Sequence, residues 1–170
     1  MGQKIIVLSA DAMVYEDTEF FKTLPNYQKY LAGGAEIKRV RSVYPTITYP
    51  AHATISTGAW PAKHGVFGNL EFHPGQLILP WNWFHSAVKC SDIFDAAKKK
   101  GLSTAGVFWP VTGSHPSIDY LIDEYWSQWE GDLPCDVFAR SGSSPEMIEI
   151  IKKNFTPQTV QRQHPSCDEF

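Results

Sequence analysis

Two threonine hydroxyls stand where a loop runs into a short helix, a position at which a side-chain oxygen can act on an anion. The stretch Tyr44–Gly58 reads Y-P-T-I-T-Y-P-A-H-A-T-I-S-T-G. Pro50 favours the start of a helix and Gly58 favours its end, so we expect about two helical turns. Thr46 and Thr48 precede this helix. Free backbone N–H groups and the positive end of the helix dipole gather there and stabilise an anion or an attacking alkoxide.

The same threonines also have a purely structural interpretation. A threonine hydroxyl is a weak nucleophile at neutral pH and needs a base, a metal ion or local positive charge. Thr46 or Thr48 could instead simply cap the helix. His52 would share a helix face with Thr48, and could be a base or ligand or could hydrogen-bond the backbone. The local pattern leaves these alternatives open.

Asp11 is a further candidate, because it follows a continuous apolar run. Residues 4–9 (K-I-I-V-L-S) predict a strand buried on both faces, as in a parallel sheet. Asp11 would then lie at the carboxyl end of that strand, where open α/β sheets bind their ligands. A turn or a cap is the alternative role. A metal ion needs several ligands, so Asp11 and Thr48 together supply only part of a set.

The rest of the chain predicts alternating helices and strands. We expect helices over 16–31 (interrupted at Pro25), 92–100 and from 145 onward, strands over 35–43, 103–108 and 120–122, and a hairpin over 70–79. Residues 126–142 look irregular. This alternation predicts an α/β fold with a mainly parallel sheet flanked by helices.

Composition sets limits on function. The 170 residues are 43% hydrophobic and 14% aromatic, which suits one folded domain rather than a disordered chain. The net charge of −3 argues against a nucleic-acid polymer as partner. The apolar run Ile5–Leu8 is too short for a signal peptide or a membrane span, so we expect a cytoplasmic protein without a membrane segment. The oligomeric state stays open.

The order and spacing of several motifs carry more information than each motif alone. In this respect the chain resembles the type I phosphodiesterase/nucleotide pyrophosphatase family of the alkaline phosphatase superfamily. The resemblance rests on Ser9-Ala-Asp11, Pro45-Thr-Ile-Thr-Tyr-Pro-Ala-His52, Thr57-Gly-Ala-Trp-Pro-Ala-Lys-His-Gly65, Gly68-Asn69 and Phe108-Trp109-Pro110.

The resemblance implies an alkaline-phosphatase-like fold and roles for four residues. Asp11 looks like a metal ligand, and Thr48 looks like the nucleophile that is also held on the metal. Asn69 looks like the donor to a non-bridging phosphoryl oxygen, and Tyr49 is a candidate for the substrate pocket. The implied enzyme cleaves phosphodiester or pyrophosphate bonds of nucleotide-type substrates through a covalent phospho-threonine, with two zinc ions as cofactors.

The chain departs from the family pattern in two ways. The family often has Asp-Gly where this chain has Asp11-Ala12, and Asn where it has Ala51. The family's later D-x-x-x-H and Asp-His ligand motifs are absent from residues 70–170. We therefore expect residues 1–155 to be the N-terminal part of a catalytic domain truncated at its C-terminus, and 156–170 a connector. Alone, this polypeptide would bind one zinc ion weakly or none and would be nearly inactive.

Two alternatives to this function remain. Other branches of the superfamily, such as phosphonoacetate hydrolases, phosphomonoesterases and phosphomutases, share some of the same N-terminal residues. A non-catalytic binding fragment is the second alternative, in which Thr48 only caps its helix.

Overall fold

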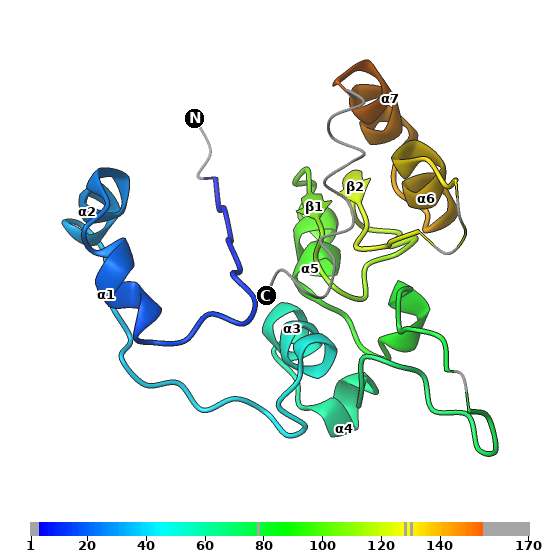
Figure 1. Ribbon diagram of the computed structural model, residues 1–170, viewed down its shortest axis with the longest axis horizontal. Coiled ribbons are helices and arrows are strands. Elements are labelled where there is room, and N and C mark those ends of the chain that lie inside the picture. The colour runs from blue at the N-terminus through cyan, green and yellow to red at the C-terminus, as the bar shows by residue number, and fades with distance from the viewer. Residues whose placement is uncertain (1–3, 78, 128, 130, 155–170) are drawn as a thin grey trace. The chain divides into compact units, whose positions relative to one another are not determined.

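The fold is described for residues 4–77, 79–127, 129 and 131–154 of a computed structural model. Contacts between residues divide the chain into two units, of which the first ends at Ser42 and the second begins at Val43. Figure 1 follows both units along the chain. The connector predicted over 156–170 lies outside the described residues.

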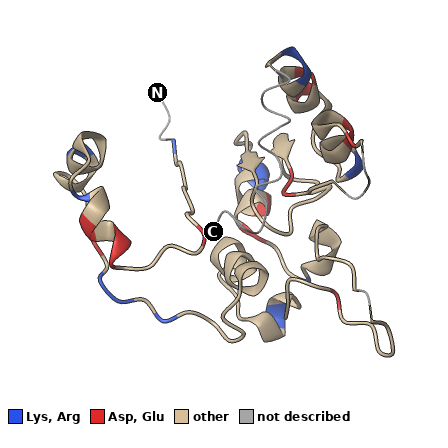
Figure 2. Cartoon of the chain, in the orientation of Figure 1, with Lys and Arg blue, Asp and Glu red and all other residues tan. Residues whose placement is uncertain are grey.

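The first unit contains two short helices, α1 (Asp17–Phe21) and α2 (Pro25–Leu31). Pro25 is the first residue of α2, which confirms the predicted interruption and fits the preference of proline for this position. Asp17 and Glu19 lie in the first turn of α1, where negative charge complements the helix dipole; Figure 2 marks them in red.

The strands predicted over 4–9 and 35–43 are wrong for the structure as observed. Both segments are irregular, and the exposed fractions of Ile5, Ile6 and Leu8 are 82%, 82% and 91%. A strand needs a hydrogen-bonded neighbour, and the described part of the first unit offers no strand to pair with. An apolar run is thus not sufficient to make a strand.

The second unit carries the sheet and most of the helices. Its elements are α3 (Thr48–Thr57), α4 (Pro61–His64), the 3₁₀ turn η1 (His85–Ala87), α5 (Ile93–Lys99), β1 (Ala105–Val107), β2 (Tyr120–Ile122), α6 (Pro134–Arg140) and α7 (Pro145–Asn154). β1 pairs in parallel with β2, with Ala105 opposite Tyr120. Helix α7 packs against both β2 and α6 (Figure 1). The α/β class is therefore confirmed.

Local signals account for most of these elements. Asp92 caps α5 in a capping box with Asp95, and Gly101 follows the helix at φ +70°. The predicted hairpin is reduced to a turn at residues 74–75 and a single antiparallel bridge between Leu70 and Trp81. Helix α6 lies inside the stretch that looked irregular.

A small aromatic core lies beneath α3. Its buried members are Tyr49, Ala53, Val66, Trp83 and Val111, and the Trp81 ring stacks on the Trp83 ring with centroids 5.4 Å apart. This packing fixes the helix that begins at Thr48. Within the described ranges, no helix is both long and apolar enough to cross a lipid bilayer.

Two glycines have the same backbone conformation, but adding a methyl group should lower the free energy of unfolding by different amounts at the two positions. Among the described residues, no atom lies within 4 Å of a Cβ added at Gly131 (φ +83°). A Cβ added at Gly142 (φ +82°) would lie 2.9 Å from the Cα of Ser114. Gly131→Ala should lower the free energy of unfolding by roughly 1–2 kcal/mol, the cost of the left-handed conformation. Gly142→Ala should cost a further ~1–3 kcal/mol from overpacking. Urea denaturation measures both, and equal losses would contradict the tight packing at Ser114.

Candidate active site

The structure places Thr48 at the first residue of α3. The preceding residue, Ile47, is the N-cap with an extended backbone (φ −134°, ψ 168°), and its apolar side chain cannot accept a hydrogen bond. The Thr46 hydroxyl donates to the carbonyl of Val43 at 2.8 Å, away from the helix. Neither threonine is therefore the N-cap residue that the structural alternative requires.

Asn69 lies against the same helix start. Its Oδ1 accepts a hydrogen bond from the backbone N–H of Tyr49 at 2.9 Å, across 20 residues of sequence. This bond satisfies one of the donors that a helix N-terminus leaves without partners, and Pro50 carries no N–H. Because Oδ1 is the acceptor, the Nδ2 amino group is the donor that Asn69 presents elsewhere. Two of the predicted site residues, Thr48 and Asn69, are thus brought together.

Asn82 holds the turn that carries Asn69. Its backbone N–H donates to the carbonyl of Asn69 at 2.8 Å, and its Nδ2 donates to the carbonyl of Gly68 at 2.8 Å. The Asn82 side chain is buried. This residue could not be predicted as part of the site, because nothing around an isolated asparagine signals contact with residues 13 and 14 positions earlier.

His52 shapes the start of α3. Its ring Nδ1 lies 2.8 Å from the carbonyl oxygen of Thr48, so Nδ1 carries the proton and donates. The ring also meets the Trp109 ring edge to face, with centroids 5.2 Å apart. Of the roles left open for His52, the structure favours the hydrogen bond to backbone.

The His64 side chain links α3 to the segment that precedes Asn69. The backbone N–H of Val66 donates to His64 Nδ1 at 3.2 Å, so the proton lies on Nε2, which is 2.9 Å from the Thr54 hydroxyl. Burial lowers the pKa of the His64 imidazole. This histidine is therefore a neutral structural link between α4 and α3.

Tyr49, the candidate for the substrate pocket, lies in the core. Only 1% of the residue is exposed, and burial together with the nearby Glu124 carboxylate raises the pKa of its phenol. A contact between Tyr49 and substrate remains a prediction, and its observed surroundings are those of a packing residue.

Asp11 belongs to the first unit. It lies in an exposed turn on the wall of an open pocket of about 490 Å³, which is also lined by Phe20 and Phe21. The next residue, Ala12, has φ +57°, a conformation that suits glycine. The departure from Asp-Gly therefore has a local cost, which is roughly 1–2 kcal/mol for a non-glycine residue.

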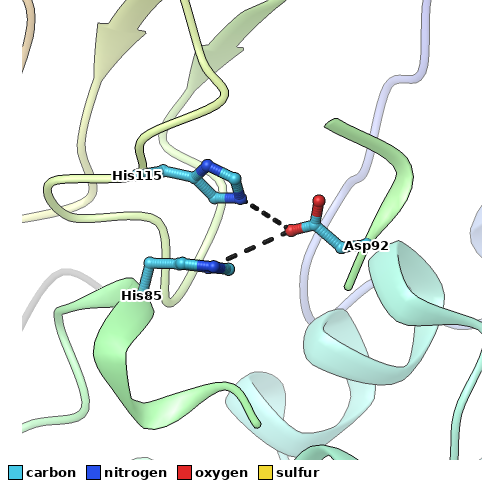
Figure 3. A group of neighbouring side chains, drawn as sticks. All are labelled: His85, Asp92 and His115. Atoms are coloured by element: carbon cyan, nitrogen blue, oxygen red, sulfur yellow. Dashed lines mark hydrogen bonds and ion pairs between the residues drawn. The ribbon is translucent and has the colours of Figure 1, made fainter. Parts of the chain in front are cut away.

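A second polar group forms where three segments of the second unit meet. His115 Nε2 lies 2.8 Å from Asp92 Oδ2, and His85 Nδ1 lies 4.0 Å from the same oxygen. Figure 3 shows both rings turned toward this carboxylate. Burial, followed by the neighbouring His115, lowers the pKa of His85. Sequence reasoning missed this group because separations of 7 and 23 residues match no ligand motif.

Comparison with known proteins decides the family. The family model for type I phosphodiesterase/nucleotide pyrophosphatase matches residues 5–165. The chain belongs to the type I phosphodiesterase/nucleotide pyrophosphatase family. The resemblance stated from its motifs is thereby confirmed.

Individual members of the type I phosphodiesterase/nucleotide pyrophosphatase family agree with this assignment. The chain is 34% identical over 128 residues to rat ectonucleotide pyrophosphatase/phosphodiesterase family member 3, covering 67% of this chain and 14% of that protein. It is 33% identical over 106 residues to venom phosphodiesterase 2 of Crotalus adamanteus, covering 56% of this chain and 13% of that protein. The chain thus spans about a seventh of the relatives that it matches.

A solved structure of the same family is also similar. Murine ectonucleotide pyrophosphatase/phosphodiesterase 5 superposes with a TM-score of 0.45 and 20% sequence identity, over 68% of this chain and 32% of that one.

Proposed function

We propose that this chain is part of a metal-dependent hydrolase that cleaves phosphodiester or pyrophosphate bonds in nucleotide-type substrates, with Thr48 as nucleophile. Family membership supports the reaction class. The observation that carries the assignment to residues is the bond of 2.9 Å between Asn69 Oδ1 and the Tyr49 N–H, which joins Asn69 to the helix start at Thr48.

In the proposed reaction, Thr48 Oγ1 attacks phosphorus while the bond from phosphorus to the leaving oxygen breaks. The hydroxyl proton is lost to solvent, and the leaving oxygen takes up a proton. Water then attacks the phosphorus of the phospho-threonine and releases Thr48 Oγ1. The positive end of the α3 dipole and the Asn69 Nδ2 donor stabilise negative charge on the non-bridging oxygens.

The donor chemistry of Asp11 and Thr48 fits a divalent metal ion, because carboxylate and hydroxyl oxygens are hard ligands. Each of the two side chains offers one oxygen ligand, and zinc commonly has four ligands. A bound metal ion would supply Lewis acidity to the hydroxyl and to the phosphoryl group. Because the chain spans about a seventh of its relatives, we propose that it is nearly inactive alone and acts within a complete catalytic domain.

Asn69→Asp is the sharpest test of the donor role. Aspartate keeps the acceptor for the Tyr49 N–H but replaces the Nδ2 donor by a negative oxygen that repels the phosphoryl group. We expect kcat for a nitrophenyl phosphodiester to fall roughly 10²–10³-fold in the complete catalytic domain, as for loss of one oxyanion donor. Circular dichroism should report an unchanged fold. Full activity of the variant would contradict the role of Asn69.

A further inference from the structure

We propose that His85, Asp92 and His115 bind a divalent metal ion of the zinc type, at a site that uses neither Asp11 nor Thr48. Each residue offers one ligand atom, and these atoms all lie within 4.8 Å of one another. Small shifts of the three side chains would place all of these atoms on one ion, since Zn–N and Zn–O distances are about 2.0–2.2 Å.

The ligand types select the metal. Two imidazole nitrogens and one carboxylate oxygen match zinc and its late transition-metal neighbours, whereas magnesium and calcium prefer oxygen ligands alone. Three protein ligands leave the fourth tetrahedral position to water. The His85 side chain is 17% exposed, which gives the ion and this water a path to solvent.

The electrostatics of the group also call for a cation. The side chains of Asp92 and His115 are 3% and 0% exposed, so a carboxylate is buried beside an imidazole. Buried charges in proteins are normally paired or metal-bound. In addition, His85 Nδ1 is buried and has no hydrogen-bond partner within the described part of the chain. A metal ion would satisfy both groups at once.

The surrounding backbone holds the ligands in place without occupying them fully. Asp92 uses Oδ1 to accept from the Asp95 N–H at 3.0 Å, which leaves Oδ2 pointing at the two rings. The backbone N–H of His85 donates to the carbonyl of Gly113 at 2.9 Å. Such outer contacts orient metal ligands. The ion would therefore tie together η1, the start of α5 and the loop between β1 and β2.

Metal binding must change one hydrogen bond, and this provides a signature. The Ser117 N–H donates to His115 Nδ1 at 3.0 Å, so the ring proton lies on Nε2 and points at Asp92. A metal ion on Nε2 displaces that proton, and the neutral ring then carries its proton on Nδ1. The bond from Ser117 is lost in exchange for a metal–nitrogen bond.

The test is a titration of the whole chain with zinc, in which calorimetry measures the binding affinity. His85→Phe keeps a ring against His115 but removes a ligand, and it should weaken zinc binding by at least about 100-fold, more than the loss of an outer-shell contact. The matched control is His73→Phe, because the His73 side chain is 42% exposed and its imidazole is paired with Glu71 at 2.8 Å. This control should bind zinc like the unmodified chain. Asp11→Asn should also leave this binding event unchanged, which separates the site from the proposed catalytic metal.

Nuclear magnetic resonance of the unmodified chain gives a second readout that needs no variant. Zinc should shift the imidazole ¹⁵N signals of His85 and His115 and move the His115 proton to Nδ1. Equal affinity of His85→Phe and the unmodified chain would overturn the proposal. Unchanged imidazole signals at saturating zinc, or no zinc binding at all, would overturn it as well.

Discussion

Replacing Thr48 by alanine is expected to lower kcat/KM for phosphodiesters by at least roughly 10³-fold in the complete catalytic domain. The proposed covalent step has no nucleophile without the hydroxyl, so only the slow direct attack of water remains. The measurement is steady-state hydrolysis of a nitrophenyl phosphodiester with zinc present.

Two further variants control this result. Thr46 lies two residues before the proposed nucleophile, and its hydroxyl donates a hydrogen bond to the Val43 carbonyl. Thr46→Ala removes this hydroxyl and should keep most of the activity. Thr48→Ser keeps a hydroxyl at the helix start and should retain far more activity than Thr48→Ala. If the Thr46 and Thr48 alanine variants lost activity equally, the loss would come from the loop and not from a nucleophile.

Asp123→Asn is expected to raise stability at alkaline pH. Asp123 follows β2, is 0% exposed, and its Oδ1 accepts from the Thr112 hydroxyl at 3.2 Å. Burial raises the pKa of its carboxyl to about 8. Between about pH 4 and pH 8 the folded protein therefore holds a proton that the unfolded chain has released. This contribution to stability is complete below pH 4 and is lost as the pH rises to 8.

The size of the effect follows from the same linkage. Each pH unit in this window removes about 1.4 kcal/mol, so the total over about four units reaches roughly 6 kcal/mol. Asparagine has no such proton, and the curve of unfolding free energy against pH should flatten between pH 5 and pH 8. Urea denaturation across this range measures it.

Asp119→Asn supplies the contrast to Asp123→Asn. Asp119 is a carboxylate whose pKa is lowered by its ion pair with Lys98, and it lies near the surface. Replacing the Asp119 carboxylate should change the free energy of unfolding only slightly between pH 5 and pH 8. Exposed ion pairs contribute little to stability, and this carboxylate stays ionised over that range. Parallel stability curves for the Asp123 variant and the unmodified chain would show that Asp123 does not hold a proton in the folded state.

Helices with local signals could be predicted from sequence. The capping box at Asp92 and the proline that starts α7 each fix an end of a helix through neighbouring residues. Helix α6 carries the same kind of signal at Pro134, but this proline lies in a stretch of tryptophans and glycines whose overall pattern is irregular. Information that is local in sequence was sufficient in these cases.

Features that depend on distant partners could not be predicted in the same way. Ile5–Leu8 has the composition of a strand, but pairing is decided by residues elsewhere. Asn69 could be predicted as a site residue only through the family resemblance, and its bond to the Tyr49 N–H could not be predicted. The group of His85, Asp92 and His115 forms because η1, the start of α5 and a loop converge, and no spacing in the sequence encodes that meeting.

The central claim is that Thr48 becomes covalently bonded to phosphorus. Its most direct test is an acid quench of the complete catalytic domain during turnover of a nucleotide-type phosphodiester, followed by mass spectrometry of its peptides. The account predicts a nucleotidyl adduct on the peptide containing Thr48, and no adduct in Thr48→Ala. Turnover without any adduct on Thr48, or an adduct on another residue, would contradict it.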